Sequence, residues 1–504
     1  MMKVGRVVGT VAAMLRIFAF AMLLPVPVAF VYDDPTWVFG GVGVPATAVL
    51  FVASFIATAG AAQVARWWVR DSDEEDMSER EGFLSAALGW LLMPLFGALP
   101  LWGGGFGGFL DSLYEAVSGV TTTGFSAAAY DLARYEPSLV YWRCVMQWLG
   151  GVGIVVLSLA LIGRLSQAGR QLFAAEASAH ASSKRLRPKL ADTAKTLLRL
   201  YVAVSVVLSA VMVLALRGNG MRWDAAFYHG TAHVLSGIST AGFSTYTRSV
   251  AAFDSLLVEC LLIAIMALGA INFQVLIAIR RGDWKTVRAD REARAFLITL
   301  GAAILFVAAT LYWAGTAPGQ ALRQAAFGTT SVVTTTGFST VDWSLWPVPA
   351  LFVLLVGMFI GGSYGSTASG MKVFRVVLLA KIVARELRRL VHPRAVMPIR
   401  IGPRIIPEEG LASVTAFMFT YVAVFAVGTL LLSLLEPTFT PLEAAGASIG
   451  SLSNIGNAFG PVGPSGSVAA LSAPTKAVMM VLMWVGRLEI FTALLLFMPA
   501  AWRH

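Results

Sequence analysis

Charged residues are scarce in this sequence of 504 residues. Asp, Glu, Lys and Arg make up 13% of the chain, whereas roughly 25% is usual for a soluble protein. Hydrophobic residues make up 57%, and glycine contributes 48 residues, a combination found in transmembrane helices that pack closely. The composition therefore indicates an all-α integral membrane protein rather than a soluble one.

Cysteine and the common catalytic motifs are also nearly absent. The two cysteines, Cys144 and Cys260, lie inside apolar runs, so no disulfide framework is expected. The sequence has no GxxxxGKS or GxxxxGKT phosphate-binding loop and no soluble segment large enough for a nucleotide. Strings that fit GxGxxG at 103–108 and GxSxG at 361–365 lack the strand or partner residues that those motifs require. Neither enzyme activity nor a cofactor bound by this chain is expected.

Long apolar runs, by contrast, are numerous. Ten of them reach the roughly 20 residues that a helix needs to cross a bilayer. They cover about residues 8–31, 41–67, 82–102, 138–163, 194–216, 251–279, 295–315, 346–380, 410–435 and 472–500. An even number of spans puts both termini on the same side of the membrane.

The basic residues indicate which side that is. Of the 38 Lys and Arg residues, 29 lie in alternate connections, namely 1–7, 66–81, 164–199, 280–294, 372–404 and 501–504. Cytoplasmic loops carry such an excess of basic residues. Both termini are therefore expected in the cytoplasm, and the net charge of +10 reflects topology rather than a nucleic-acid partner.

A short polar segment recurs on the opposite, outward-facing side. It reads TTTGFS at 121–126, STAGFS at 239–244 and TTTGFS at 334–339, and a diverged copy, SLSNIGNAFG, stands at 451–460. Each copy lies between two spans and follows a segment too short to cross the membrane. The sequence therefore predicts four membrane-pore-membrane repeats with pseudo-fourfold symmetry, preceded by two extra N-terminal transmembrane helices.

The boundaries of the predicted units follow from this pattern. The N-terminal helix pair takes residues 1–81, and the repeats take 82–193, 194–293, 294–408 and 409–504. The filter segments within the repeats are 122–126, 240–244, 335–339 and 454–458.

Loops at membrane depth suggest a pore. An unpaired backbone group in hydrocarbon costs several kcal/mol, so such loops must be buried in protein or line a watery path. Rings of backbone carbonyls from several loops can replace the water shell of a potassium ion. The residues expected to bind K+ are Thr122, Thr123, Gly124, Thr240, Ala241, Gly242, Thr335, Thr336, Gly337, Asn454, Ile455 and Gly456. Each loop keeps one glycine where the potassium-channel pattern TVGYG has two, so weaker discrimination against rubidium or sodium is expected.

The sequence also points to an irregular segment below the pore. The run 346–380 exceeds one crossing and contains GGSYGSTASG at 361–370, which is expected to break the helix, although a close-packing helix face is an alternative. Arg487, near the middle of the last span, should face the interior and pair with carbonyls of the broken loop. Asp111 and Glu443 each precede a filter glycine by 13 residues and either form an acidic vestibule or begin the pore helices.

Three further strings, with the four loops, carry a likeness to a known family. They are QWLGGVGIVV at 147–156, GGSYGSTASGMKVFR at 361–375 and GRLEIF at 486–491. Over essentially its whole length the chain resembles the Trk-type membrane pore subunit of the Trk/Ktr/HKT superfamily of potassium uptake proteins. It departs from the family pattern at Ala241 and at Asn457-Ala458, where many relatives have Pro-Gly.

The resemblance implies a function and a set of partners. It implies potassium uptake across the inner membrane of a bacterium by a homodimer, embedded in membrane lipid and controlled by a cytosolic nucleotide-binding regulatory subunit. It also implies an intramembrane gating loop. The gating residues are then Gly361, Gly362, Ser363, Gly365, Ser366, Gly370, Lys372 and Arg487. The alternative is a symporter, a secondary active transporter coupled to H+ or Na+, although the spans hold few carboxylate or histidine residues for a relay.

Overall fold

The computed structural model describes residues 4–39, 42–69, 78–162, 186–401 and 404–502. Helices dominate this part of the chain. Strands form two short hairpins there, β1 (Trp37–Phe39) with β2 (Val42–Val44) and β3 (Arg400–Ile401) with β4 (Arg404–Ile405). The all-α fold class predicted from composition is confirmed. Half of the basic segment 66–81 and most of the segment 164–199 lie outside the described residues.

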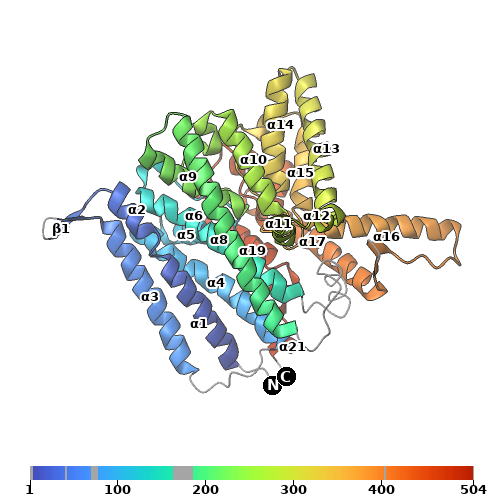
Figure 1. The fold of residues 1–504 in the computed structure, drawn as a ribbon, viewed down its shortest axis with the longest axis horizontal. Helices are drawn as coiled ribbons and strands as arrows, with labels where there is room; N and C mark the ends of the chain where they lie inside the picture. Colours follow the sequence, from blue (N-terminus) through green and yellow to red (C-terminus); the bar gives the residue numbers. More distant parts are fainter. Residues whose placement is uncertain (1–3, 40–41, 70–77, 163–185, 402–403, 503–504) are drawn as a thin grey trace.

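The N-terminal helices form one edge of the molecule. They are α1 (Val4–Ala21), α2 (Pro25–Tyr32) and α3 (Ala46–Trp68), and α1 packs against both α3 and the following helix α4 (Glu79–Gly103) (Figure 1). Pro25 opens α2, where a residue without a backbone N–H is tolerated. The carboxylate of Asp33 accepts hydrogen bonds from Thr47 Oγ1 at 2.5 Å and Ser138 N at 3.0 Å, which ties this edge to the first repeat.

The remaining helices repeat the order span, short helix, loop, span. The first two sets are α4, α5 (Phe109–Val120) and α6 (Pro137–Ile162), then α8 (Leu186–Gly218), α9 (Trp223–Ile238), α10 (Leu256–Ala270) and α11 (Phe273–Arg280). The third, after α12 (Trp284–Ala289), is α13 (Arg291–Trp313), α14 (Pro318–Val333), α15 (Val348–Ile360) and α16 (Val373–Val391). The fourth is α17 (Glu408–Leu435), α18 (Pro441–Leu452), α19 (Ala473–Arg487), α20 (Phe491–Leu495) and α21 (Pro499–Trp502).

The short helices are the predicted pore helices. Helices α5, α9, α14 and α18 have 12, 16, 16 and 12 residues, too few for the roughly 20 that a bilayer requires. Local signals fix where they begin: a Thr440–Glu443 capping box starts α18, and Pro318 occupies the first turn of α14. Short 3-10 turns follow each loop, namely η1 (Leu132–Arg134), η3 (Ser249–Phe253), η4 (Trp343–Leu345), η5 (Gly460–Val462) and η6 (Val468–Ala470).

The spans are less regular than the sequence predicts. Within the described residues, six helices are long and apolar enough to cross a membrane, or seven if the bent pair α10 and α11 counts as one. The three other predicted spans, 138–163, 346–380 and 472–500, correspond to α6, to α15 with α16, and to α19 with α20. Two of the predicted spans are broken in the structure, because α10 and α11 meet at 106° within 251–279 and α19 ends at Arg487 within 472–500.

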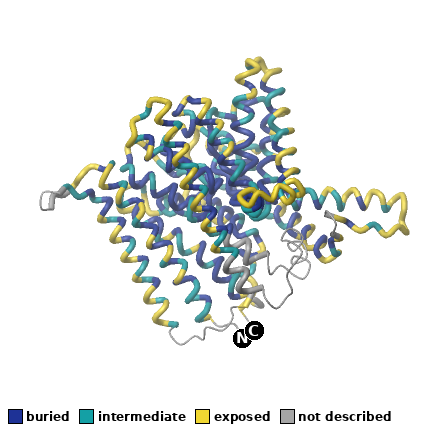
Figure 2. The backbone as a smooth tube through the Cα atoms, in the orientation of Figure 1, coloured by how far each residue is buried: buried dark blue, intermediate teal, exposed yellow. Residues whose placement is uncertain are grey.

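Burial is concentrated where the four sets of helices meet. Figure 2 shows the buried backbone gathered in the middle of the molecule, where the pore helices end. The start of α1 and helix α21 lie on the same side of the molecule (Figure 1). Helix α16 projects away from the helical body on the opposite flank from α3 (Figure 1).

Candidate ion pathway and intramembrane loop

The four filter glycines lie against one another in a closed ring. A Cβ added to Gly124 would lie 2.1 Å from the Ala241 oxygen, and one on Gly242 would lie 2.1 Å from the Thr336 oxygen. A Cβ on Gly337 would lie 2.8 Å from the Gly456 nitrogen, and one on Gly456 would lie 2.3 Å from the Gly124 carbonyl carbon. The loops therefore adjoin in chain order, with the fourth returning to the first.

Backbone conformation repeats around this ring. The first residue of each filter triplet has a left-handed φ, at 54° for Thr122, 50° for Thr240, 59° for Thr335 and 53° for Asn454. The glycines of the first three loops are also left-handed, with φ of 95°, 84° and 88°, whereas Gly456 is not. Each left-handed non-glycine residue costs about 1–3 kcal/mol, so the surrounding structure must enforce it.

The ends of the pore helices supply that enforcement. In each loop the middle residue of the triplet donates its N–H to the carbonyl five residues earlier, which caps the helix. The four bonds run from Thr123 to Ser118, Ala241 to Ser236, Thr336 to Ser331 and Ile455 to Gly450, at 2.8, 3.0, 2.8 and 2.7 Å. These N–H groups therefore point back toward the pore helices and are not turned toward the ring.

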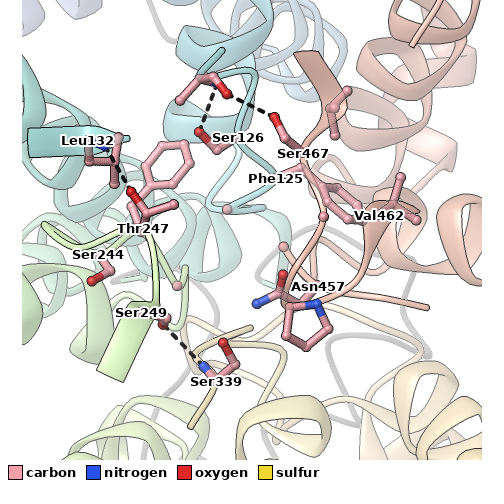
Figure 3. A pocket seen from close by; sticks show the side chains of 18 of the residues that line it. Phe125, Ser126, Leu132, Ser244, Thr247, Ser249, Ser339, Asn457, Val462 and Ser467 are labelled. Atoms are coloured by element: carbon pink, nitrogen blue, oxygen red, sulfur yellow. Dashed lines mark hydrogen bonds between the residues drawn. The ribbon is translucent and has the colours of Figure 1, made fainter. Parts of the chain in front are cut away.

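A small cavity opens on the outer side of the ring. It has a volume of about 100 Å³, and Figure 3 shows serine, threonine and asparagine side chains around it. Within the described chain, Arg143 is its only charged lining residue. Asp111 and Glu443 are not among the residues that line it. Asp111 pairs with Lys476 at 2.7 Å, and Glu443 closes the capping box of α18, so the alternative that both residues begin pore helices is confirmed.

The polar segment predicted at 361–370 is non-helical. Helix α15 ends at Ile360 and α16 begins at Val373. Gly361, Gly365 and Gly370 between them have φ of 71°, 71° and 81°, and Lys372 has φ of 71°. The alternative of a continuous, close-packing helix face is therefore wrong. We call residues 361–372 the intramembrane loop.

This intramembrane loop lies directly against the filter. The Ser369 N–H donates to Thr335 Oγ1 at 2.9 Å, and Thr240 Oγ1 donates to Thr367 Oγ1 at 3.2 Å. The contacts involve the second and third filter loops. On the first loop, the hydroxyl of Thr122 is buried without a hydrogen-bond partner among the described residues.

The break between α10 and α11 holds the intramembrane loop from the other side. The N–H groups of Ser363 and Thr367 donate to the carbonyls of Ala270 and Gly269 at 2.9 and 3.1 Å. In return, the Phe273 N–H donates to the Gly365 carbonyl at 3.2 Å. Two broken helices thus satisfy each other's backbone groups, as irregular backbone at membrane depth requires.

Arg487 completes this cluster from the end of α19. Its Nη1 donates to the Thr367 carbonyl at 2.9 Å and to Ser369 Oγ at 3.0 Å, and its Nη2 donates to the Gly150 carbonyl at 3.0 Å. The side chain is 1% exposed. The expected contact between Arg487 and loop carbonyls is therefore present, although Arg487 ends a helix instead of lying in the middle of one.

The other predicted gating residues belong to the same segment. The Lys372 ammonium donates to the Ala368 carbonyl, and Ser366 Oγ donates to the Ser363 carbonyl at 2.6 Å. A Cβ on Gly362 would lie 2.5 Å from the Ala368 side chain, so only glycine fits there. All eight predicted gating residues are thus brought together. Their role in gating stays a prediction.

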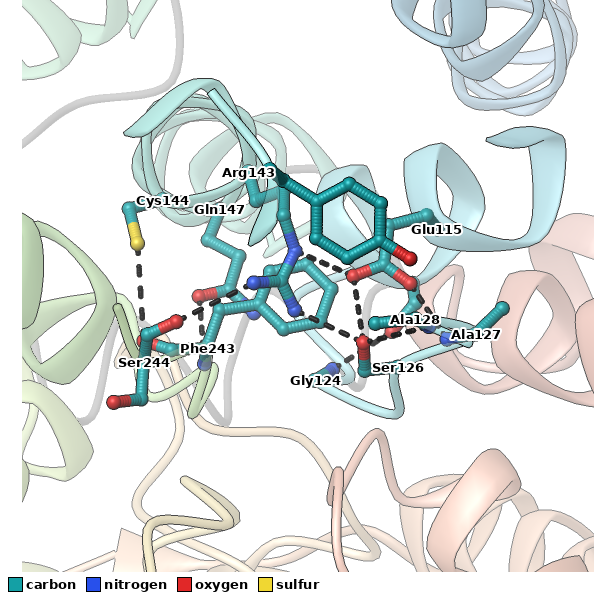
Figure 4. Close-up of polar contacts among 12 residues, drawn as sticks. Glu115, Gly124, Ser126, Ala127, Ala128, Arg143, Cys144, Gln147, Phe243 and Ser244 are labelled. Carbon is teal, nitrogen blue, oxygen red and sulfur yellow. Dashed lines mark hydrogen bonds and ion pairs between the residues drawn. The ribbon is translucent and has the colours of Figure 1, made fainter. Parts of the chain in front are cut away.

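A buried ion pair behind the filter was not predicted. Arg143 Nε donates to Glu115 Oε1 at 2.5 Å, and the two side chains are 1% and 0% exposed (Figure 4). Arg143 also donates to the Ser244 carbonyl at 3.3 Å and to Ser126 Oγ at 3.1 Å, and its guanidinium lies 4.1 Å from the ring centre of Phe243. The pair therefore ties the first filter loop to the second.

Gln147, in α6, holds the second loop and its pore helix. Its Nε2 donates to the Ala241 carbonyl at 2.8 Å, and its Oε1 accepts from Phe243 N at 3.1 Å and Ser236 Oγ at 2.7 Å (Figure 4). The Ala241 carbonyl of the ring is thus already hydrogen-bonded. Gln147 could have been singled out from the sequence, because it is an amide in an otherwise apolar span.

Together the fold and the ring define a class: single-chain membrane proteins in which four re-entrant loops surround one axis. A family model described as TrkH, cation transport protein, matches residues 49–503 of this chain. The chain therefore belongs to the TrkH family of cation transport proteins.

Relatives match along the full length of the chain. The Trk system potassium uptake protein TrkH of Halomonas elongata is 33% identical, with 100% of both chains covered. The protein of the same name from Escherichia coli K12 is 32% identical over 99% of both. The crystal structure of the potassium transporter TrkH from Vibrio parahaemolyticus superposes with a TM-score of 0.85 at 31% identity, covering 100% of both chains.

Removing one partner of the Glu115–Arg143 pair should destabilise the fold. Arg143→Met leaves a buried carboxylate without its cation, so we expect the free energy of unfolding to fall by about 3–5 kcal/mol. The double variant Glu115→Leu/Arg143→Met should recover most of that loss, because an apolar pair of similar volume removes the uncompensated charge. Thermal unfolding of the purified protein in detergent measures both.

Arg222 provides the control for this experiment. It forms an ion pair with Asp224 at 3.2 Å, but its side chain is 86% exposed, so Arg222→Met should change stability by no more than about 0.5 kcal/mol. An equal loss of stability in the single Arg143 variant and the double variant would contradict the assignment of a buried, coupled pair.

Proposed function

We propose that this chain mediates potassium uptake across the cytoplasmic membrane of a bacterium, with K+ passing through the ring of filter loops. The observation that carries the proposal is the closed ring itself. Its N–H groups are bound to their own pore helices, which leaves carbonyl oxygens to coordinate a dehydrated cation. The names of the full-length relatives, potassium uptake proteins and a potassium transporter, agree with this choice of ion.

The pore helices favour a cation at the ring electrostatically. Each of the four ends where its filter loop begins, so its C-terminal end faces the ring. The C-terminus of a helix carries about half a negative elementary charge. Four such ends stabilise a monovalent cation without any carboxylate in the path. The twelve filter residues predicted from the sequence are the proposed K+ ligands, and the Ala241 carbonyl would share its oxygen between the ion and Gln147. No cofactor is needed in this chain.

The intramembrane loop is the proposed gate. It contacts two filter threonines, and the positive charge of Arg487 lies within the same cluster, where it opposes the passage of a cation. Helix α16 continues directly from the loop and projects from the body of the protein (Figure 1). A cytosolic nucleotide-binding regulatory subunit that moves α16 would therefore move the loop.

Assembly and orientation complete the proposal. The protein is proposed to act as a homodimer in the inner membrane, with both termini in the cytoplasm. The excess of Lys and Arg in 280–294 and 372–404 supports that orientation, because cytoplasmic connections carry such an excess.

Growth rescue tests the function directly. A bacterium deficient in potassium uptake should grow at low external potassium when it carries this chain together with a cytosolic regulatory subunit. Flux measurements in vesicles then separate two mechanisms, since passive uptake follows the Nernst potential, whereas a symporter moves protons or sodium in a fixed ratio. Failure to restore growth despite normal membrane insertion would count against potassium uptake.

Gly337→Ser should weaken the filter. The new Cβ would lie 2.8 Å from the Gly456 nitrogen at a left-handed φ of 88°. Strain of about 1–3 kcal/mol should raise the KM for potassium by roughly tenfold. Rubidium or potassium uptake kinetics measure the change. Gly301→Ser in α13 is the matched control, because nothing lies within 4 Å of its Cβ position; unchanged kinetics in both variants would remove Gly337 from the filter.

Deleting residues 362–368 should raise basal flux. The deletion removes Thr367, one of the two loop residues that contact the filter, and the loop carbonyl that Arg487 binds. Rubidium flux in vesicles without the regulatory subunit provides the measurement, and membrane yield and thermal stability show whether the variant folds. A folded, inserted variant without flux would rule out a plug.

A further inference from the structure

Asn457 interrupts a pattern that the other filter loops share. The residue after the filter glycine is Phe125, Phe243 or Phe338 in the first three loops, and each of these rings is at most 2% exposed. Asn457 holds the same position in the fourth loop. It is only partly buried, and its side chain lines the outer cavity (Figure 3). A polar side chain therefore reaches the pathway in one quarter of the ring.

The backbone around Asn457 is fixed from outside the ring. The N–H of Ala458 donates to the Val462 carbonyl at 2.9 Å, and the carbonyl of Ala458 accepts from Trp343 Nε1 at 2.8 Å. Gly456 lacks the left-handed φ of the other three filter glycines. The fourth loop therefore does not continue the backbone curl at this level, and the side chain of Asn457 occupies the space facing the ring.

Asn457 contacts the filter directly. Its Nδ2 donates a hydrogen bond to the carbonyl oxygen of Gly337, the filter glycine of the third loop. A carbonyl that accepts this bond has less electron density to offer a cation, and the N–H group adds a partial positive charge at the mouth. Among the described residues, no group donates a hydrogen bond to Asn457 Oδ1.

We propose that the carboxamide of Asn457 belongs to the outermost cation site and sets its affinity and selectivity, an inference that rests on the proposed potassium uptake. While Nδ2 donates to the Gly337 carbonyl, neither the Asn457 side chain nor that carbonyl offers a free oxygen to a cation at this outermost site. Half a turn about χ2 exchanges Nδ2 for Oδ1, since the two ends of the amide have nearly the same shape. The turn releases the Gly337 carbonyl and brings a side-chain oxygen to an incoming monovalent cation.

Three variants at Asn457 test the proposal, because they change the oxygen supply in opposite directions. Asn457→Asp cannot donate and adds a negative charge, so the KM for potassium should fall by about threefold or more. Asn457→Leu keeps the volume but offers no oxygen, so the KM should rise. Asn457→Ala frees the Gly337 carbonyl and should shift the rubidium-to-potassium uptake ratio and the inhibition by sodium. A purely structural role would instead change the KM in the same direction for the Asp and Leu variants, and that result would overturn the proposal.

Asn219 provides a matched control. Its Nδ2 also donates to a backbone carbonyl, that of Phe253 at 3.4 Å, but it lies after α8 and is not part of the cavity lining. Asn219→Asp should leave the KM and the ion ratio unchanged. The thermal stability of each purified variant, measured with and without about 100 mM potassium, shows whether bound potassium still stabilises the folded protein.

The outcomes separate this inference from the proposed function. Opposite shifts in KM for the Asp and Leu variants support it. Normal uptake by the unsubstituted protein, with the same KM, ion ratio and potassium protection in every Asn457 variant, would overturn the inference alone. Absence of potassium uptake by the unsubstituted protein would overturn the proposed function, and the inference with it.

Discussion

The structure depends on one constraint, that backbone polar groups at membrane depth must find partners within the protein. The pore helices meet it by accepting hydrogen bonds from the filter loops that follow them. The broken helices satisfy this constraint together. Backbone groups of the intramembrane loop form hydrogen bonds with the residues between α10 and α11 and with Arg487. The hydrogen bonds to the pore helices use the N–H groups of the filter loops, which supports the proposal that their carbonyl oxygens coordinate a cation.

Much of this arrangement was accessible from the sequence. The recurring hexapeptide predicted the loops, and its spacing located the diverged fourth copy at Gly456, which lies next to Gly124 in the ring. The small-residue run at 361–370 predicted the break after α15, since glycine, serine and threonine both disfavour a buried helix and offer partners. These features could be predicted because each is encoded locally, in a composition that differs from the surrounding apolar runs.

Other features depend on distant partners and could not be predicted. The carboxylate of Glu115 lies in a pore helix and Arg143 in a span 28 residues later, so their pairing appears only when the helices pack. The bend after α10 has a weak local signal, Asn272, whose side chain caps α11 by accepting from Gln274 N at 2.9 Å. Asp111 likewise pairs with Lys476, a residue 365 positions later in the sequence.

Encoding all four quarters on one polypeptide has a consequence for how such a pathway can diverge. In an assembly of four identical subunits every substitution appears in all four quarters, so its energetic effect is exerted four times. Here asparagine replaces phenylalanine after the filter glycine in the fourth loop only, and the Glu115–Arg143 pair is built from residues of the first repeat. Natural selection can therefore change one quarter of the ring at a time, and the side chains around the ring need not be symmetric even where the backbone is.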